Sequence, residues 1–110
     1  MQQAEVTSVL ENEPLEDFRC QARKASELLK ALSHETRLLI LCTLNEGEKT
    51  VSELEEMLGL QQAAVSQQLA RLRADMLVKT RREGRQVFYS IADPNVRLVV
   101  DALYQGFCAR

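Results

Sequence analysis

Three cysteines and one histidine are the residues of this sequence best suited to thiol oxidation or to binding a soft metal. Cys42 lies inside an aliphatic run, "LLILCTLNEGE", and Cys108 lies near the end of the chain, in "GFCAR". No two cysteines form a CxxC pair and His34 is the only histidine, so a zinc or iron site within one chain lacks ligands. We therefore expect no metal and no cofactor. Each thiol is then either buried filler, which is common for free cysteine, or a reactive group.

The composition indicates one globular domain. The chain has 110 residues, of which 45% are hydrophobic and 27% charged. No stretch reaches the roughly 18 apolar residues of a membrane span. The segment "MQQAEVTSVLENEPLEDF" is acidic and has neither the basic start nor the apolar run of a signal peptide. We expect a flexible acidic arm over residues 1–14, a domain over residues 15–110, no membrane association and a cytoplasmic location, where thiols stay reduced.

Apolar residues recur at helical spacing in several segments that turn signals separate. The predicted helices cover about residues 15–32, 34–44, 51–58, 62–75 and 95–108. Thr50 and Glu53 form a capping-box pattern before the third helix, and Gly59 ends it. The fourth helix has a predicted apolar face of Val65, Leu69, Leu72 and Met76. The predicted apolar side of the last helix consists of Val96, Val99, Val100, Leu103 and Phe107. A short helix, a tight turn and a second helix with a polar outer face are the parts of a helix-turn-helix.

A β-hairpin follows the helix-turn-helix. Residues 77–80 and 86–91 are rich in β-forming residues, and Gly84 supplies the positive φ that the tip between them needs. The resulting wing carries Arg81, Arg82 and Arg85. The fold class is therefore mainly α with a β-hairpin wing, a winged helix-turn-helix with added helices at both ends. We expect a homodimer through the first and last helices, because their apolar stripes need cover.

The charge distribution favours a double-stranded DNA partner. Residues 71–85 carry a net charge of +4 and the rest of the chain −6, which is the pattern of a surface that meets phosphate. Glutamine and serine side chains on the exposed face of the fourth helix are suited to base edges in the major groove. No aromatic platform for unstacked RNA bases is visible. The predicted DNA-contacting residues are Gln62, Ala63, Ser66, Gln67, Arg71, Lys79, Arg81, Arg82 and Arg85.

These segments resemble the ArsR/SmtB family of bacterial repressors. The resemblance runs from Leu28 onward through "LLKALSHETRLLILCTL", "TVSELEEMLGLQQAAVSQQLARLRADMLVKTRREGRQVFYSI" and the helix after Asp93. It implies a winged-helix homodimer that binds a palindromic operator and releases it when an inducer binds. The chain lacks the cysteine or histidine ligands of the family's metal sensors. It also has Gln61 where many relatives have a capping serine, which predicts a less firmly capped recognition helix.

The placement of the thiols is similar to that of the BigR/SqrR subgroup, whose members sense persulfide and other reactive sulfur species. This resemblance implies that Cys42 and Cys108 become joined by a disulfide or polysulfide bridge, that DNA affinity then falls, and that sulfide-detoxification genes are expressed. Cys20 is interpreted as a bystander. His34 is interpreted as a helix-start residue that can raise the reactivity of a cysteine brought close to it.

Other functions remain open at this point. The same scaffold suits a peroxide-responsive thiol switch, and the cysteine positions are also similar to those of the HlyU-like activators, which displace a silencing protein. A thiol enzyme is disfavoured, because the sequence has no CxxC pair and no clustered base. A protein-interaction module with a decayed DNA-reading head is the remaining alternative.

Overall fold

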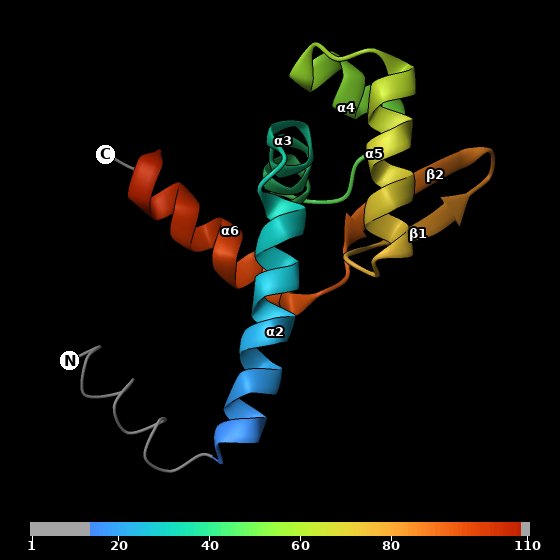
Figure 1. The fold of residues 1–110 in the computed structure, drawn as a ribbon. Coiled ribbons are helices and arrows are strands. Elements are labelled where there is room, and N and C mark those ends of the chain that lie inside the picture. Colours follow the sequence, from blue (N-terminus) through green and yellow to red (C-terminus); the bar gives the residue numbers. More distant parts are fainter. Residues whose placement is uncertain (1–13, 109–110) are drawn as a thin grey trace. The chain divides into compact units, whose positions relative to one another are not determined.

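A computed structural model describes residues 14–108 of the chain. Its elements follow in the order α2 (Leu15–Leu32), α3 (Glu35–Leu44), α4 (Val51–Leu58), α5 (Gln62–Ala74), β1 (Val78–Glu83), β2 (Gln86–Ile91) and α6 (Pro94–Phe107). This order confirms the predicted winged helix-turn-helix (Figure 1). None of the helices in this range has the length and apolar character needed to cross a membrane. Apart from Pro14, the predicted arm over residues 1–14 lies outside the described residues.

The chain divides into two units between Ala31 and Leu32, and α2 is described here by itself. Glu16 and Asp17 lie in its first turn and Lys30 lies in its last turn. At these ends the charges interact favourably with the helix dipole and stabilise the helix. Leu15 and Leu29 are exposed, at 62% and 56% of their surface. The helix therefore presents uncovered apolar side chains within the chain.

The core of the unit that begins at Leu32 is built around α3. This helix is apolar on most of its faces, which is typical of a helix that other elements surround. It contacts α4, α5, β2 and α6, and Ile40, Leu41 and Leu44 are fully buried. The side chains that complete this core are Leu54, Val65, Leu69, Leu72, Leu77, Val78, Ile91, Val96 and Val100.

Local signals at the helix ends explain why the predicted boundaries hold. The His34 Nδ1 accepts a long hydrogen bond of 3.5 Å from the backbone N–H of Arg37, which confirms His34 as a helix-start residue. Thr50 and Glu53 form the full capping box at the start of α4. Gly59 ends α4 in the left-handed region with φ of +66°. Gln61 precedes α5 without a side-chain capping bond, as predicted.

The hairpin is longer and its tip shorter than predicted. The strands β1 and β2 pair from Val78↔Ile91 to Glu83↔Gln86, which leaves only Gly84 and Arg85 in the turn. Gly84 has φ of +62°, the conformation that a tight hairpin turn requires. The prediction placed Arg81 and Arg82 at the tip, whereas both lie inside β1. In Figure 1 the tip of the hairpin and α6 lie on opposite sides of α3.

The last helix follows its predicted start but buries fewer residues than expected. Asp93 caps α6 by accepting a 2.9 Å hydrogen bond from the backbone N–H of Asn95, and Pro94 occupies the first turn. Val96 and Val100 are buried, as predicted. Phe107 was predicted on the same apolar side but is 73% exposed, because it lies at the end of the helix beyond the core.

Met76 was also predicted in the core, and this prediction is wrong because the helix ends before it. Its side chain is 78% exposed and its φ is +61°. The backbone N–H groups of Met76 and Leu77 bond the carbonyls of Arg73 and Leu72, each at 2.9 Å. These two bonds define a Schellman motif, in which glycine usually takes the left-handed position. A side chain in this conformation is strained.

Replacing Met76 with glycine is expected to stabilise the fold. The strain of the left-handed side chain is relieved and no packing is lost, so the free energy of unfolding in urea should rise by about 0.5–1 kcal/mol after the added flexibility of the unfolded chain is counted. The control is Ala74→Gly, inside the last turn of α5, which should lower it by about 0.5–1 kcal/mol. Equal destabilisation by both changes contradicts the assignment of strain to Met76.

Candidate functional site

The predicted base-reading residues lie on the first two turns of α5. Gln62, Ala63 and Gln67 are exposed and Ser66 is half-buried, while Val65 on the opposite side is fully buried in the core. The Gln62 Nε2 donates a 3.1 Å hydrogen bond to the Ser66 hydroxyl. Because these positions are one turn apart, their side chains form one polar surface that the core holds in place.

Four of the predicted basic contacts are exposed and free to move. Arg71 has one ion pair, with Asp75 at 3.9 Å, and both side chains are largely exposed. Such a pair contributes little and leaves the guanidinium available. Lys79, Arg82 and Arg85 form no ion pair with any residue in the range 14–108. These four cations can therefore meet phosphate without first losing a strong protein partner.

Arg81 has a different environment from the other basic residues of the hairpin. Its Nε lies 2.9 Å and 3.3 Å from the two carboxylate oxygens of Glu48, and its Nη1 lies 3.3 Å from Glu83. The guanidinium carbon also lies 4.5 Å from the centre of the Phe88 ring. The hydrogen bond from Arg81 lowers the pKa of Glu48, and the same contact raises the pKa of Arg81. These contacts thus hold the Arg81 side chain in one position on the surface of the hairpin.

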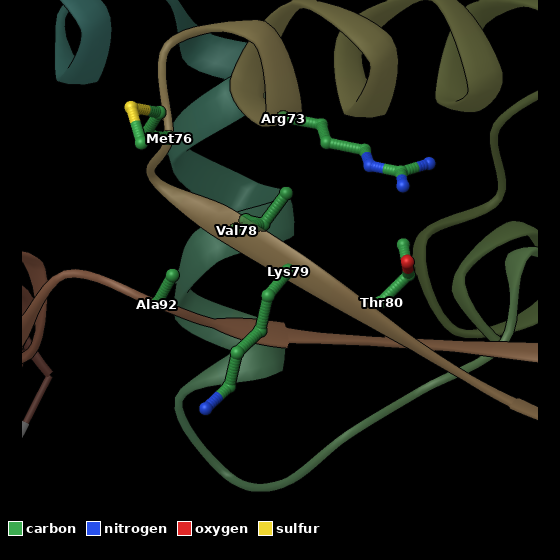
Figure 2. Close-up of a pocket in the computed structure, with 6 residues that line it drawn as sticks. All are labelled: Arg73, Met76, Val78, Lys79, Thr80 and Ala92. Atoms are coloured by element: carbon green, nitrogen blue, oxygen red, sulfur yellow. The ribbon is translucent and has the colours of Figure 1, made fainter.

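A shallow depression of about 540 Å³ lies where α5 meets the hairpin, and its lining includes the predicted contact residue Lys79. Arg73, Met76 and Thr80 contribute to the same surface. In Figure 2 the side chain of Arg73 extends to the right and that of Lys79 extends downward, so their charged ends lie apart. Their charges do not converge on one point, so the depression lacks the geometry of an anion pocket.

The two predicted sensor thiols lie on neighbouring helices of the same unit. Cys42 is half-buried in α3, and Cys108 is exposed at the end of α6, where its backbone N–H bonds the Tyr104 carbonyl at 2.8 Å. Burial raises the pKa of the Cys42 thiol, and repulsion from the Cys108 thiolate raises it further. The two thiols thus come from helices that contact each other, α3 and α6.

The remaining thiol and the histidine lie on other segments of the chain. Cys20 is exposed on α2, in the other unit. His34 is occupied as the cap of α3, and the two causes of the Cys42 shift are burial and Cys108. Within residues 14–108 no three side chains of histidine, cysteine, aspartate or glutamate gather in a way that can hold a metal ion.

Sequence reasoning missed the contacts of the loop between α3 and α4. The Asn45 side-chain amide donates a 2.7 Å hydrogen bond to Asp101 of α6, and Lys49 exchanges backbone hydrogen bonds of 3.0 Å and 2.8 Å with Tyr89 of β2. Glu48 supplies the carboxylate that binds Arg81. These partners are 33 to 56 residues apart in the sequence, and no local pattern signals them.

Comparisons with known proteins agree with this arrangement. A family model described as "Bacterial regulatory protein, arsR family" matches residues 34–80. The biofilm growth-associated repressor of Xylella fastidiosa strain 9a5c is 45% identical over 95 residues, which cover 86% of this chain and 83% of that protein. The transcriptional activator HlyU of Vibrio cholerae is 43% identical over 94 residues, which cover 86% and 87% of the two chains.

The fold comparison gives the same result. The crystal structure of the transcriptional repressor BigR from Xylella fastidiosa matches with a TM-score of 0.80 and 44% identity, covering 89% of this chain and 100% of that one. All of these relatives are transcriptional regulators, so the chain is a regulator and not an enzyme. The chain belongs to the arsR family of bacterial regulatory proteins.

Proposed function

We propose that this transcriptional regulator is a homodimeric repressor that binds a palindromic operator and releases it when reactive sulfur joins Cys42 to Cys108. The observation that carries the proposal is that the two thiols come from α3 and the end of α6, two helices that contact each other in the unit that also contains α5. A chemical change at the thiols can thereby act on the element proposed to read DNA.

In this proposal α5 enters the major groove. Gln62, Ser66 and Gln67 read base edges, and the methyl group of Ala63 allows a close approach. The exposed cations Arg71, Lys79, Arg82 and Arg85 bind phosphates beside the groove. Two such heads related by a two-fold axis fit two half-sites about one helical turn apart, which accounts for a palindromic operator.

The dimer interface is proposed to be formed by the first and last helices. Leu98, Tyr104 and Phe107 of α6 are exposed at 68%, 56% and 73% of their surface within one chain. Leu15 and Leu29 of α2 are similarly uncovered. A second copy of the chain would remove these side chains from water, and a two-fold axis would use the same surface on both copies.

The sensing chemistry is proposed to begin at Cys108, the more accessible thiol. Its thiolate attacks the outer sulfur of a persulfide RSSH, so that Cys108 becomes a persulfide and RS⁻ leaves. The Cys42 thiolate then attacks the Cys108 sulfur, forms the Cys42–Cys108 disulfide and releases HS⁻. The two cysteines are oxidised and the persulfide is reduced to a thiol and sulfide. Each further persulfide molecule lengthens the bridge by one sulfur before closure.

The proposal includes a cytosolic location. Two alternatives challenge its other parts, the sulfur inducer and repression. Hydrogen peroxide can oxidise Cys108 to a sulfenic acid and is itself reduced to water; the Cys42 thiol then attacks the Cys108 sulfur, and its hydroxyl group leaves as water, which gives the same disulfide. HlyU is 43% identical and is named an activator, so promoter binding without repression is the other outcome.

The two thiols are expected to differ in reactivity. In a Cys20→Ser background, iodoacetamide at pH 7 should label Cys108 before Cys42. The raised pKa keeps the thiolate fraction of Cys42 small at neutral pH, so its labelling rate should climb as the pH rises through and beyond the ordinary range for thiols. Mass spectrometry of peptides measures both rates, and the unfolded protein is the control. Equal rates in the folded protein at pH 7 contradict this order of reaction.

The operator-release model is tested with a fluorescent duplex that the reduced protein selects from random-sequence DNA. Glutathione persulfide should weaken binding by the wild type and by Cys20→Ser, on the order of 5- to 150-fold. Cys42→Ser and Cys108→Ser should keep their affinity, and intact mass should show the bridge only where both thiols remain. Release by matched hydrogen peroxide alone supports the peroxide alternative. Occupancy without repression in purified transcription supports the activator alternative.

Two variants are expected to distinguish base recognition from phosphate binding, because the first changes sequence preference and the second changes the salt dependence of the affinity. Gln67→Ala should weaken binding to the selected duplex by about 1–3 kcal/mol and relax its base preference at one position. Arg85→Ala should weaken binding to all duplexes alike and reduce the salt slope by about 1. Titrations at several salt concentrations measure both effects. Unchanged affinity in both variants contradicts this orientation of the head.

A further inference from the structure

We propose that the loop of residues 45–50 between α3 and α4, here called the coupling loop, carries the state of the thiol pair to the wing. Asn45 holds one end of this loop to α6, and Glu48 and Lys49 hold the other end to the hairpin. This inference rests on the proposed thiol switch and names the residues through which it reaches DNA.

The loop is attached to α6 by hydrogen bonds that two α6 side chains form with Asn45, here called the Asn45 clamp. The Asn45 Nδ2 donates to the Asp101 Oδ1 at 2.7 Å, and the Arg97 Nη1 donates to the Asn45 Oδ1 at 3.2 Å and to its backbone carbonyl at 3.5 Å. Arg97 and Asp101 are one turn apart on α6. Asn45 therefore keeps the end of α3 at a fixed position along the last helix.

The thiols lie on the same two helices as this clamp. Cys42 precedes Asn45 by three residues on α3, and Cys108 follows Asp101 by seven residues on α6. A bridge fixes the distance between the two sulfurs within the narrow range that disulfide geometry allows. Because α6 moves as a rigid helix, a shift at Cys108 also moves Arg97 and Asp101 relative to Asn45.

The attachment to the wing consists of backbone and side-chain contacts. Lys49 and Tyr89 exchange two backbone hydrogen bonds, which form an isolated antiparallel β-bridge between the coupling loop and β2. Glu48 binds Arg81 of β1, and Arg81 stacks on Phe88 of β2. Movement of residues 48 and 49 thus moves both strands of the hairpin.

The loop between these two attachments is short and internally bonded. Its backbone N–H groups at Glu46 and Gly47 bond the carbonyls of Thr43 and Leu44, at 3.1 Å and 3.0 Å. The Lys49 Nζ donates a 3.2 Å hydrogen bond to the Gly47 carbonyl. Three residues span at most about 11 Å when extended, and these hydrogen bonds must break before the loop can lengthen, so the intact loop passes on a displacement of α6.

This arrangement gives Arg81 a different role from its neighbours. Arg82 and Arg85 are free cations, whereas Arg81 positions the wing by joining it to the coupling loop through Glu48. Glu48 is accordingly a positioning residue for DNA binding, although it contacts no DNA in this proposal.

The test compares Glu48→Gln with Glu46→Gln in the full-length protein. Both changes remove one negative charge from the same loop, but the Glu46 side chain is exposed and makes no hydrogen bond or ion pair among residues 14–108. Each protein is titrated with the selected duplex before and after glutathione persulfide, and intact mass confirms the bridge. The reduced-to-bridged affinity ratio should fall in Glu48→Gln by about 2- to 30-fold and stay at the wild-type value in Glu46→Gln.

Asn45→Ala is the second variant and cuts the loop from α6 without touching the wing. It should lower the same ratio while the bridge still forms, which a purely structural role for Asn45 does not predict. A wild-type ratio in Glu48→Gln and Asn45→Ala overturns the coupling loop but leaves the thiol switch intact. A wild-type protein that is bridged yet keeps its affinity overturns the proposed function instead. Tighter binding with a steeper salt slope in Glu48→Gln also overturns the inference, because it makes Arg81 a phosphate contact that Glu48 masks.

Discussion

The burial of α3 is the constraint on which the rest of this fold depends. Ile40, Leu41 and Leu44 of this helix are fully buried where it packs on α4, α5, β2 and α6, so its inner face cannot shift without disturbing a close-packed core. Cys42 lies on this helix, half-buried between the core and the exposed Cys108. Burial raises the pKa of this thiol, and a covalent change there acts on a helix that contacts four other elements of the winged unit.

The hairpin register explains why Arg81 has side-chain partners and Arg82 has none among the described residues. Alternate residues of β1 point to opposite faces, so Arg81 turns toward Phe88 and Glu48 while Arg82 faces the other way. A cation that is fixed by a carboxylate and an aromatic ring shapes the wing. A cation without such partners can exchange its counterions for phosphate. In the proposed complex with DNA, the same residue type therefore has two roles within one strand.

The sequence predicted the helices well because their ends carry local chemistry: the capping box at Thr50, the left-handed Gly59 and the Asp93 cap before Pro94. The sequence-based prediction failed at Met76, where the backbone is left-handed. Glycine usually occupies such a position, so a methionine there gives no signal that the helix has ended. The thiol pair came only from resemblance to a family, since spacing along the chain does not state that α3 and α6 are neighbours. Glu48 was missed because its partner lies 33 residues away.

The hydrogen bond between Gln62 and Ser66 has a consequence for how a regulator of this kind tells one DNA sequence from another. The two side chains already satisfy part of each other's polar groups, so contact with bases is an exchange of partners and not a simple gain. A matching base pair replaces what is given up, whereas a mismatched one leaves desolvated groups without partners. Discrimination then comes chiefly from the penalty imposed on wrong sites.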